Sequence, residues 1–296
     1  MTLARTGLAG ADGPTELAKS WWLVAAGLAV MYLPLYWWAA EYIWQTEEHG
    51  HGPIILAVLA WLFWNLRQPL AALPSDRAWQ GWAVFAIGLL VYGLGRTFRI
   101  SVFEFGSQPL ILAGGLLLLK GWPGLRLAWF PILYCVFMIP LPGMLVDALT
   151  NPLKQWISVV VVELLHLAGY PIARSGVMIT VGQYQMLVAD ACSGLHSMFS
   201  LSALGTLFMY VMQRRSWLHN GIMLAAILPI AITANIVRVI VLILITYHYG
   251  DEAGQGFLHG MAGMVLLMIS LLLLFGIDQV LARVLPGKRA AAPLAA

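Results

Sequence analysis

The segment VADACSGLHS precedes a long apolar run and contains side chains that could do chemistry. Cys192 is followed by two small residues, Ser193 and Gly194, which leave its sulfur open to approach. If Cys192 opens a helix, the unpaired N–H groups there stabilise the thiolate over the thiol. Cysteine is also a common buried small residue, so packing is the alternative. The polar neighbours Asp190 and His196 count against packing, so the sequence supports a nucleophile and a packing residue equally.

A basic residue in a later apolar run could assist such a nucleophile. Arg238 stands in ITANIVRVIVLILITY about nine residues before Tyr247, with Asn235 on the same helix face. A charge inside a bilayer costs at least ~2.5–3.5 kcal/mol on insertion scales and usually faces a polar interior or cavity. We therefore expect Arg238 to be functional or to pair with a buried acid such as Asp190; snorkelling to the headgroups is the alternative.

Two histidines could carry the proton. His259, in LHGMAG, begins the last apolar run, and His196 lies one helical turn after Cys192 as a rival base. A thiolate, a guanidinium and an imidazole suffice for acyl transfer at a peptide carbonyl. Spacing alone does not show that they meet. Cys135, in PILYCVFMIP, has no ionisable neighbour and is expected to pack.

Other chemistries find little support in the sequence. His49 and His51 in HGHGP follow two glutamates, but an HxH pair without a third spaced ligand is a weak metal signal. The chain contains no HExxH, CxxC, Walker loop, GxGxxG or GxSxG. The net charge of +3 is small and spread along the chain, which argues against a nucleic-acid partner. We therefore predict no metal and no cofactor.

The composition predicts an all-α polytopic membrane protein. Of its 296 residues, 61% are hydrophobic and 10% are charged, whereas soluble domains average about 45–50% and 25%. A span needs roughly 20 apolar residues. We expect about eight spans, at residues 21–40, 54–70, 79–95, 107–120, 125–141, 194–213, 217–247 and 257–282.

The basic residues predict the orientation. With a cytoplasmic N-terminus, the inner segments hold 11 of the 16 Lys and Arg residues, so both termini are expected in the cytoplasm and the Cys192 segment outside. We expect a cytoplasmic segment over residues 1–20, a single transmembrane domain over 21–285, and a disordered cytoplasmic tail over 286–296.

The longest non-spanning segment, residues 142–190, is expected outside. Its apolar part NPLKQWISVVVVELLHLAG is interrupted by Lys154, Glu163 and His166, so we expect an outer interfacial helix over residues 151–169. The next part, GVMITVGQYQMLVAD, alternates like two strands around a Gly-Gln pair, which predicts a short extracytoplasmic β-hairpin.

Three motifs in order, ACSGLHS, NIVR and LHGMAG, resemble the exosortases, membrane cysteine transpeptidases of Gram-negative bacteria. The segments HGHGPIILAVLAWLFW and FMIPLPGMLVDALTNPLKQWIS also match that family's layout. The likeness runs from about Trp37 to Asp278, and CSGLHSMFSLSALG is closest to the exosortase B subgroup.

The resemblance implies a role for each member of the trio: Cys192 as nucleophile, Arg238 as essential cation and His259 as proton carrier. Many relatives carry Arg or Asn in place of His196, so that residue is a spectator, a substrate contact or an auxiliary base. The candidate auxiliary or substrate-binding residues are Asp190, Ser193, Gly194, His196 and Asn235.

The resemblance also implies the partners. Substrates would be secreted proteins that end in a Pro-Glu-Pro motif, a membrane helix and a basic tail. The enzyme would cleave them near the motif, at the periplasmic face of the inner membrane, through a thioacyl intermediate. It would then pass them to an acceptor, in connection with exopolysaccharide.

Two alternatives remain from the residues alone. A multi-span transporter would use Arg238 as a substrate or ion contact, but no inverted repeat or pair of broken helices is evident. A non-catalytic subunit of a polysaccharide export complex would use Cys192 only for packing.

Overall fold

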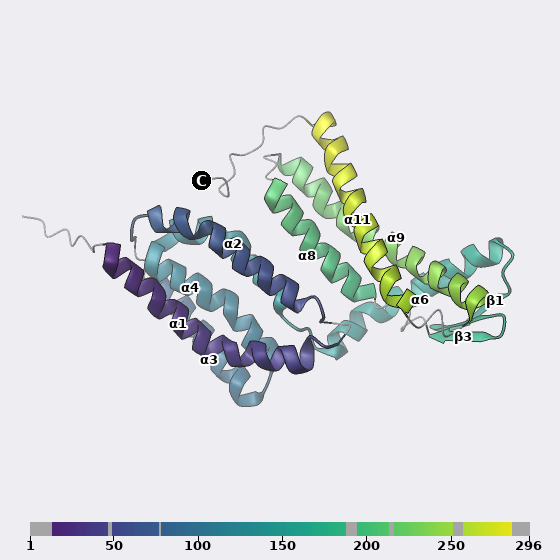
Figure 1. The fold of residues 1–296 in the computed structure, drawn as a ribbon, viewed down its shortest axis with the longest axis horizontal. Helices are drawn as coiled ribbons and strands as arrows, with labels where there is room; N and C mark the ends of the chain where they lie inside the picture. The colour runs from purple at the N-terminus through teal and green to yellow at the C-terminus, as the bar shows by residue number, and fades with distance from the viewer. Residues whose placement is uncertain are drawn as a thin grey trace, which may run out of the picture.

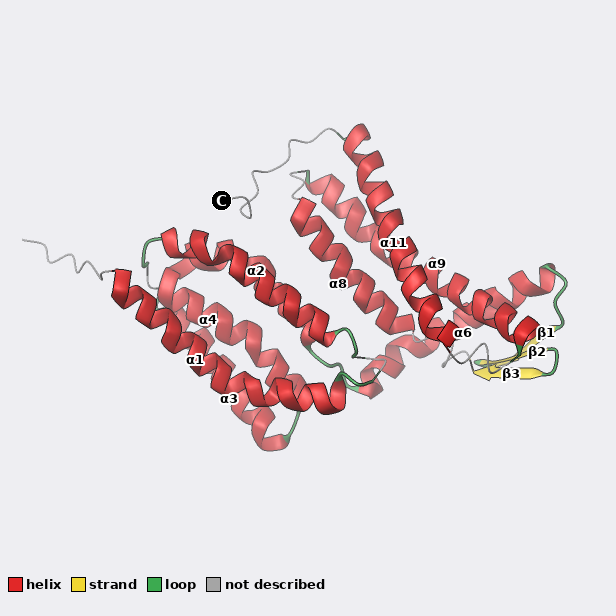
Figure 2. Ribbon diagram, in the orientation of Figure 1, coloured by secondary structure: helices red, strands yellow, loops and turns green. Residues whose placement is uncertain are grey.

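The computed structural model describes residues 14–46, 49–76, 78–187, 194–212, 216–250 and 257–285 (Figures 1 and 2). These residues form helices and one small sheet, which confirms a helical polytopic membrane protein. Within the described part, five helical segments are long and apolar enough to cross a membrane. They are α2 (Gly52–Ala72), α3 (Gln80–Phe98), α4 (Ser101–Leu127), α9 (Trp217–Tyr249), and residues Met264–Val284 of α11 (Phe257–Val284).

The first half of the chain is a bundle of α1 (Pro14–Trp38), α2, α3 and α4 (Figure 1). A short π-helix, Ala39–Ile43, continues α1. Helix α1 begins at Pro14, inside the expected cytoplasmic segment 1–20. Residues 1–13 of that segment and the expected tail 286–296 lie outside the described residues. The fourth expected span, 107–120, extends toward the N-terminus to Ser101; at its other end α4 is kinked at Gly121, whose φ is 64°, and continues to Leu127.

The fifth expected span, 125–141, does not form one long helix. Helix α5 (Trp129–Tyr134) and a 3₁₀ turn (Cys135–Met138) are together ten residues, about 15 Å of α-helical rise against a hydrocarbon core of about 30 Å. Helix α4 already takes the residues up to Leu127. The helical segment stops before Pro140, because a proline pushes the preceding residue, Ile139, into an extended conformation.

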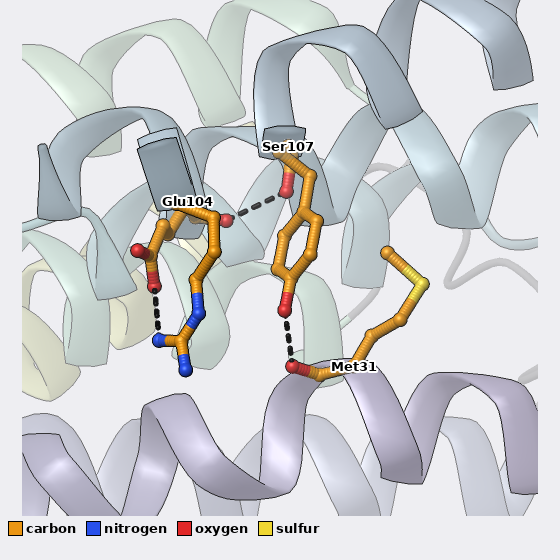
Figure 3. A network of polar contacts seen from close by, with 5 residues as sticks. Met31, Glu104 and Ser107 are labelled. Atoms are coloured by element: carbon orange, nitrogen blue, oxygen red, sulfur yellow. Dashed lines mark hydrogen bonds and ion pairs between the residues drawn. The ribbon is translucent and has the colours of Figure 1, made fainter. Parts of the chain in front are cut away.

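Helices α3 and α4 approach each other closely through glycine. A Cβ atom on Gly88 would lie 2.7 Å from Cγ1 of Ile111, and one on Gly114 would lie 2.6 Å from the backbone N of Phe85. Polar contacts join this pair to α1: the hydroxyl of Tyr92 donates to the carbonyl of Met31 at 2.7 Å (Figure 3). The bundle is therefore held by close backbone contact and buried hydrogen bonds.

Helix α8 (Gly194–Met212) connects the two halves of the protein. The ring of Tyr210 stacks on Phe130 of α5, with centroids 3.9 Å apart and planes 4° apart. Ala203 of α8 lies in the same apolar core as residues of α1, α2 and α4. The opposite side of α8 packs on α9 and α11.

An outer unit comprises helix α6 (Gly143–Leu167) and an antiparallel sheet in the order β1-β2-β3 (Figure 2). The strands are β1 (Ile172–Ser175), β2 (Met178–Val181) and β3 (Tyr184–Leu187). The expected hairpin is confirmed as β2 and β3, whose turn begins at Gly182 with a φ of 57°, a conformation that glycine adopts readily. Strand β1 is an addition to that prediction. Helix α6 begins eight residues before residue 151, and its place in the membrane interface stays a prediction.

The outer unit packs on the last turns of α9. Its core combines residues of α6, β2, β3 and α9. These are Ile157, Val161, Leu165, Ile179, Val181, Met186, Val239, Leu242 and Ile243. Helix α9 therefore belongs to two parts of the protein: its first turns pack with α8 and α11, and its last turns carry the sheet.

Candidate functional site

The expected site residues that the structure describes lie on α8, α9 and α11. Cys192, Asp190 and Ser193 lie outside the described residues. Gly194 is the first residue of α8, and His196 follows in its first turn. His259 is the third residue of α11. Arg238 and Asn235 lie in α9, where their side chains are only 7% and 3% exposed.

A close contact at Gly205 sets the register of three helices. A Cβ atom there would lie 2.8 Å from Cδ1 of Ile227 and 3.4 Å from Cδ1 of Leu274, so α8, α9 and α11 meet at this level. Helix α9 runs antiparallel to the other two (Figure 1). Gly194 is eleven residues before Gly205 on α8, and Arg238 is eleven residues after Ile227 on α9. Both therefore lie about 16 Å from this level, at ~1.5 Å per residue. Arg238 is therefore level with the helix start that follows Cys192.

A second contact sets the register of α9 against α11 independently. His219 Nε2 lies 2.8 Å from Oδ1 of Asp278, and both side chains are 2% exposed. Nineteen residues forward on α9 is Arg238, and nineteen residues back on α11 is His259. The contact at Gly205 brings Ile227 to the level of Leu274. Counted eleven residues along each helix from there, Arg238 is level with residue 263, which is one helical turn from His259. By either contact, the backbone of His259, in the first turn of α11, lies within about 6 Å of Arg238 along the helix axis.

The length of α9 shows how deep Arg238 lies. Its 33 residues measure about 50 Å, whereas about 20 residues fill the hydrocarbon core. Counted from Trp217, which is 83% exposed, twenty residues end at Ile236. If the span begins at Trp217, we expect Arg238 near the edge of the bilayer; Val239, the next residue, packs on the outer unit.

A small cavity of about 20 Å³ lies on the bilayer side of Arg238, between α8, α9 and α11. Its lining comprises Leu201, Ala231, Ala234, Asn235, Arg238, Leu266, Leu267 and Ser270. Asn235 thus shares with Arg238 both a helix face and a cavity wall, as the spacing of the two residues predicts.

Cys135 has the packing role that the sequence predicts. Its side chain is 1% exposed in the core of the first bundle, and its Sγ donates to the carbonyl of Pro131 at 3.3 Å. No group of three His, Cys, Asp or Glu residues that could hold a metal ion occurs among the described residues.

Sequence reasoning missed two features of the C-terminal helices. The buried pair of His219 and Asp278 could have been suspected, because an acid within an apolar run such as LLLLFGIDQV usually has a partner. The sequence gave no indication that Ser270 lines a cavity, because serine is frequent wherever membrane helices pack.

Comparison with known families identifies the family of this chain. Residues 37–276 match the family described as transmembrane exosortase. No curated protein and no solved structure matches the chain. The match is to the family, so the B subgroup stays a prediction. Because the match covers far more than half of the chain, the protein belongs to the transmembrane exosortase family.

Proposed function

We propose that this exosortase is a cysteine transpeptidase in which Cys192, Arg238 and His259 act together. One observation carries the proposal: the start of α8, the guanidinium-bearing turn of α9 and the first turn of α11 lie at one level at one end of the bundle. We propose that this common level brings the three residue types needed for acyl transfer to one place.

The interval of buried residues on α11 supports the role of His259. Asp278, Leu274 and Ser270 are almost fully buried at intervals of four residues on one helix face. The same face continues through residues 267 and 263 to His259.

The reaction follows from the chemistry of these groups. The Cys192 thiolate attacks a peptide carbonyl, and the guanidinium of Arg238 stabilises the thiolate and the oxyanion. The C–N bond breaks, and the imidazolium of His259 gives its proton to the departing amine. A thioester remains on Cys192. An acceptor nucleophile, deprotonated by the same imidazole, then attacks the thioester and releases the thiolate.

The depth of the site suits a substrate held by one membrane helix. A peptide bond just outside such a helix reaches the edge of the bilayer, which is where we propose that Arg238 lies. We propose that the substrates carry the Pro-Glu-Pro motif, helix and basic tail expected from the resemblance, that the site faces the periplasm, and that the acceptor step is linked to exopolysaccharide. His196 and Asp190 are proposed as auxiliary or substrate-binding residues.

The sheet could guide the substrate to this site. Gly182, at the turn before β3, lies against Tyr247 near the end of α9, with 3.2 Å between a Cβ there and Cε2 of Tyr247. Strand β3 then runs back along α9 toward Arg238 and ends five residues before Cys192. An extended peptide that added to β3 as a further strand would be carried along the same path.

Alkylation of intact cells tests the proposal. In a Cys135→Ala background, a membrane-impermeant thiol reagent is expected to label Cys192 at neutral pH, because a thiolate at the outer edge of the bilayer is reactive and accessible. The matched variant Cys192→Ala keeps only Cys135, which is 1% exposed and is expected to stay unlabelled. A Cys192 that reacts only in alkaline solution, or only after the membrane is permeabilised, would refute the proposed site.

A further inference from the structure

The cavity beside Arg238 is polar on one side and apolar on the other. Arg238, Asn235 and Ser270 contribute polar atoms, and the five other lining residues are leucine or alanine. Ser270 donates its hydroxyl hydrogen to the carbonyl of Leu266 at 2.8 Å. A serine hydroxyl has two acceptor lone pairs, so Ser270 can still accept a hydrogen bond from a molecule in the cavity.

The volume of the cavity matches that of a water molecule. A volume of about 20 Å³ exceeds the ~10–15 Å³ needed for one water molecule, so the cavity can hold one. A buried water needs two to four polar partners, and the lining offers three. Ala231 and Ala234 line this space, so a longer side chain at either position would take up part of it.

We infer that the cavity binds one structural water, through which Asn235 and Ser270 hold the guanidinium of Arg238 in its working position. Arg238 donates to the water, and the water donates to Ser270 and Asn235. The side chain of a long arginine has many rotamers, and each fixed hydrogen bond reduces their number. Asn235 and Ser270 are then positioning residues, since they act on the reaction only through Arg238. The inference rests on the proposed role of Arg238 beside Cys192.

The reactivity of Cys192 reports on this arrangement. A cation held near the sulfur favours the thiolate, so a loosened Arg238 slows alkylation at neutral pH and moves its pH midpoint upward. We would measure the alkylation rate of Cys192 against pH in the purified full-length protein, in a Cys135→Ala background. The variants are Ser270→Ala, which removes an acceptor, and Ala234→Val, which takes up part of the cavity.

A matched control separates this effect from loss of a helix hydrogen bond. Thr206 of α8 donates to the carbonyl of Ser202 at 2.8 Å, as Ser270 does to Leu266, but does not line the cavity. We expect Ser270→Ala and Ala234→Val to lower the neutral-pH rate about tenfold, the order expected for one hydrogen bond to a charged group. Thr206→Val is expected to leave the rate unchanged.

A further variant, Arg238→Gln, distinguishes the two possible failures. If Arg238→Gln slows alkylation while Ser270→Ala and Ala234→Val do not, the water-mediated positioning is wrong and the role of Arg238 stands. If Arg238→Gln itself leaves the pH midpoint unchanged, the proposed role of Arg238 is wrong, and the inference falls with it.

Discussion

The imidazole Nε2 of His219, near the start of α9, lies 2.8 Å from Oδ1 of Asp278, near the end of α11. This contact is buried, and it is one of the two that set the register of Arg238 against His259. A pair at one end of the bundle thus helps to align the residues at the other end, about 28 Å away along each helix.

Removing one partner of this pair is expected to destabilise the protein. Asp278→Ala leaves His219 buried without its acceptor, and a buried polar group left unsatisfied costs about 1–3 kcal/mol. Thermal unfolding in detergent should show a clearly lower Tm for Asp278→Ala than for Asp278→Asn, which keeps a hydrogen-bonding group. Equal Tm values for the two variants would mean that the contact does not hold the helices together.

Enlarging Gly205 should separate the three helices that form the site. A Cβ atom there already lies 2.8 Å from Ile227, so Gly205→Leu requires the helices to move apart, at a cost of about 1–3 kcal/mol. We expect substrate processing to fall at least tenfold, while the protein remains in the membrane. Gly276→Leu on α11 is the control, because nothing lies within 4 Å of a Cβ atom at Gly276. Equal processing by both variants would contradict the proposed register.

Proline substitution tests whether β3 receives the substrate as an added strand. Successive N–H groups of a strand point to opposite edges, so one of Tyr184 and Gln185 donates toward β2 and the other away from it. Of Tyr184→Pro and Gln185→Pro, we expect the one that removes the outward N–H group to reduce substrate processing while the protein level stays normal. Ala173→Pro, on the opposite edge of the sheet, is the control. Normal processing across Val177 to Val188, with protein levels maintained, would exclude strand addition.

Lys120 should stabilise the bundle through the end of α2. Its side chain is 1% exposed, and its Nζ donates to the carbonyl oxygens of Leu73 at 2.7 Å and Ala71 at 3.3 Å. Lys120→Met leaves these carbonyls unsatisfied, which costs about 1–3 kcal/mol. We expect a lower Tm in detergent, whereas Arg126→Met, an exposed position on the same helix, should change it little. A Tm for Lys120→Met as high as that of the unmodified protein would show that water replaces the amine.

Hydropathy predicts much of this fold because lipid selects apolar helices of one length. Expected span 54–70 is α2, and the alternation around Gly182 is the β2–β3 hairpin. The apolar run from Trp217 to Tyr249 shows where this reasoning stops. Its first part has the length of a span, whereas its last turns pack on the sheet, and both surroundings are apolar. The sequence alone therefore does not separate the turns of α9 that would span the bilayer from those that pack on the sheet.

The candidate site was predictable in its residue types but not in its geometry. The order of Cys192, Arg238 and His259 names the groups, because a nucleophile, a cation and a proton carrier are unusual beside long apolar runs. Their common level depends on contacts at Gly205 and Asp278, which are remote from the three residues in sequence. Such register contacts leave no local pattern to find.

The most direct measurement compares Cys192→Ala with Cys135→Ala in the native host, following the size and surface release of a protein with a Pro-Glu-Pro tail. Immunoblots must show equal levels of both variants. The account predicts that Cys192→Ala alone leaves the substrate uncleaved in the membrane, because Cys135 is buried in the first bundle. Normal processing by Cys192→Ala would show that Cys192 is a packing residue, and the transpeptidase mechanism proposed for this site would be wrong.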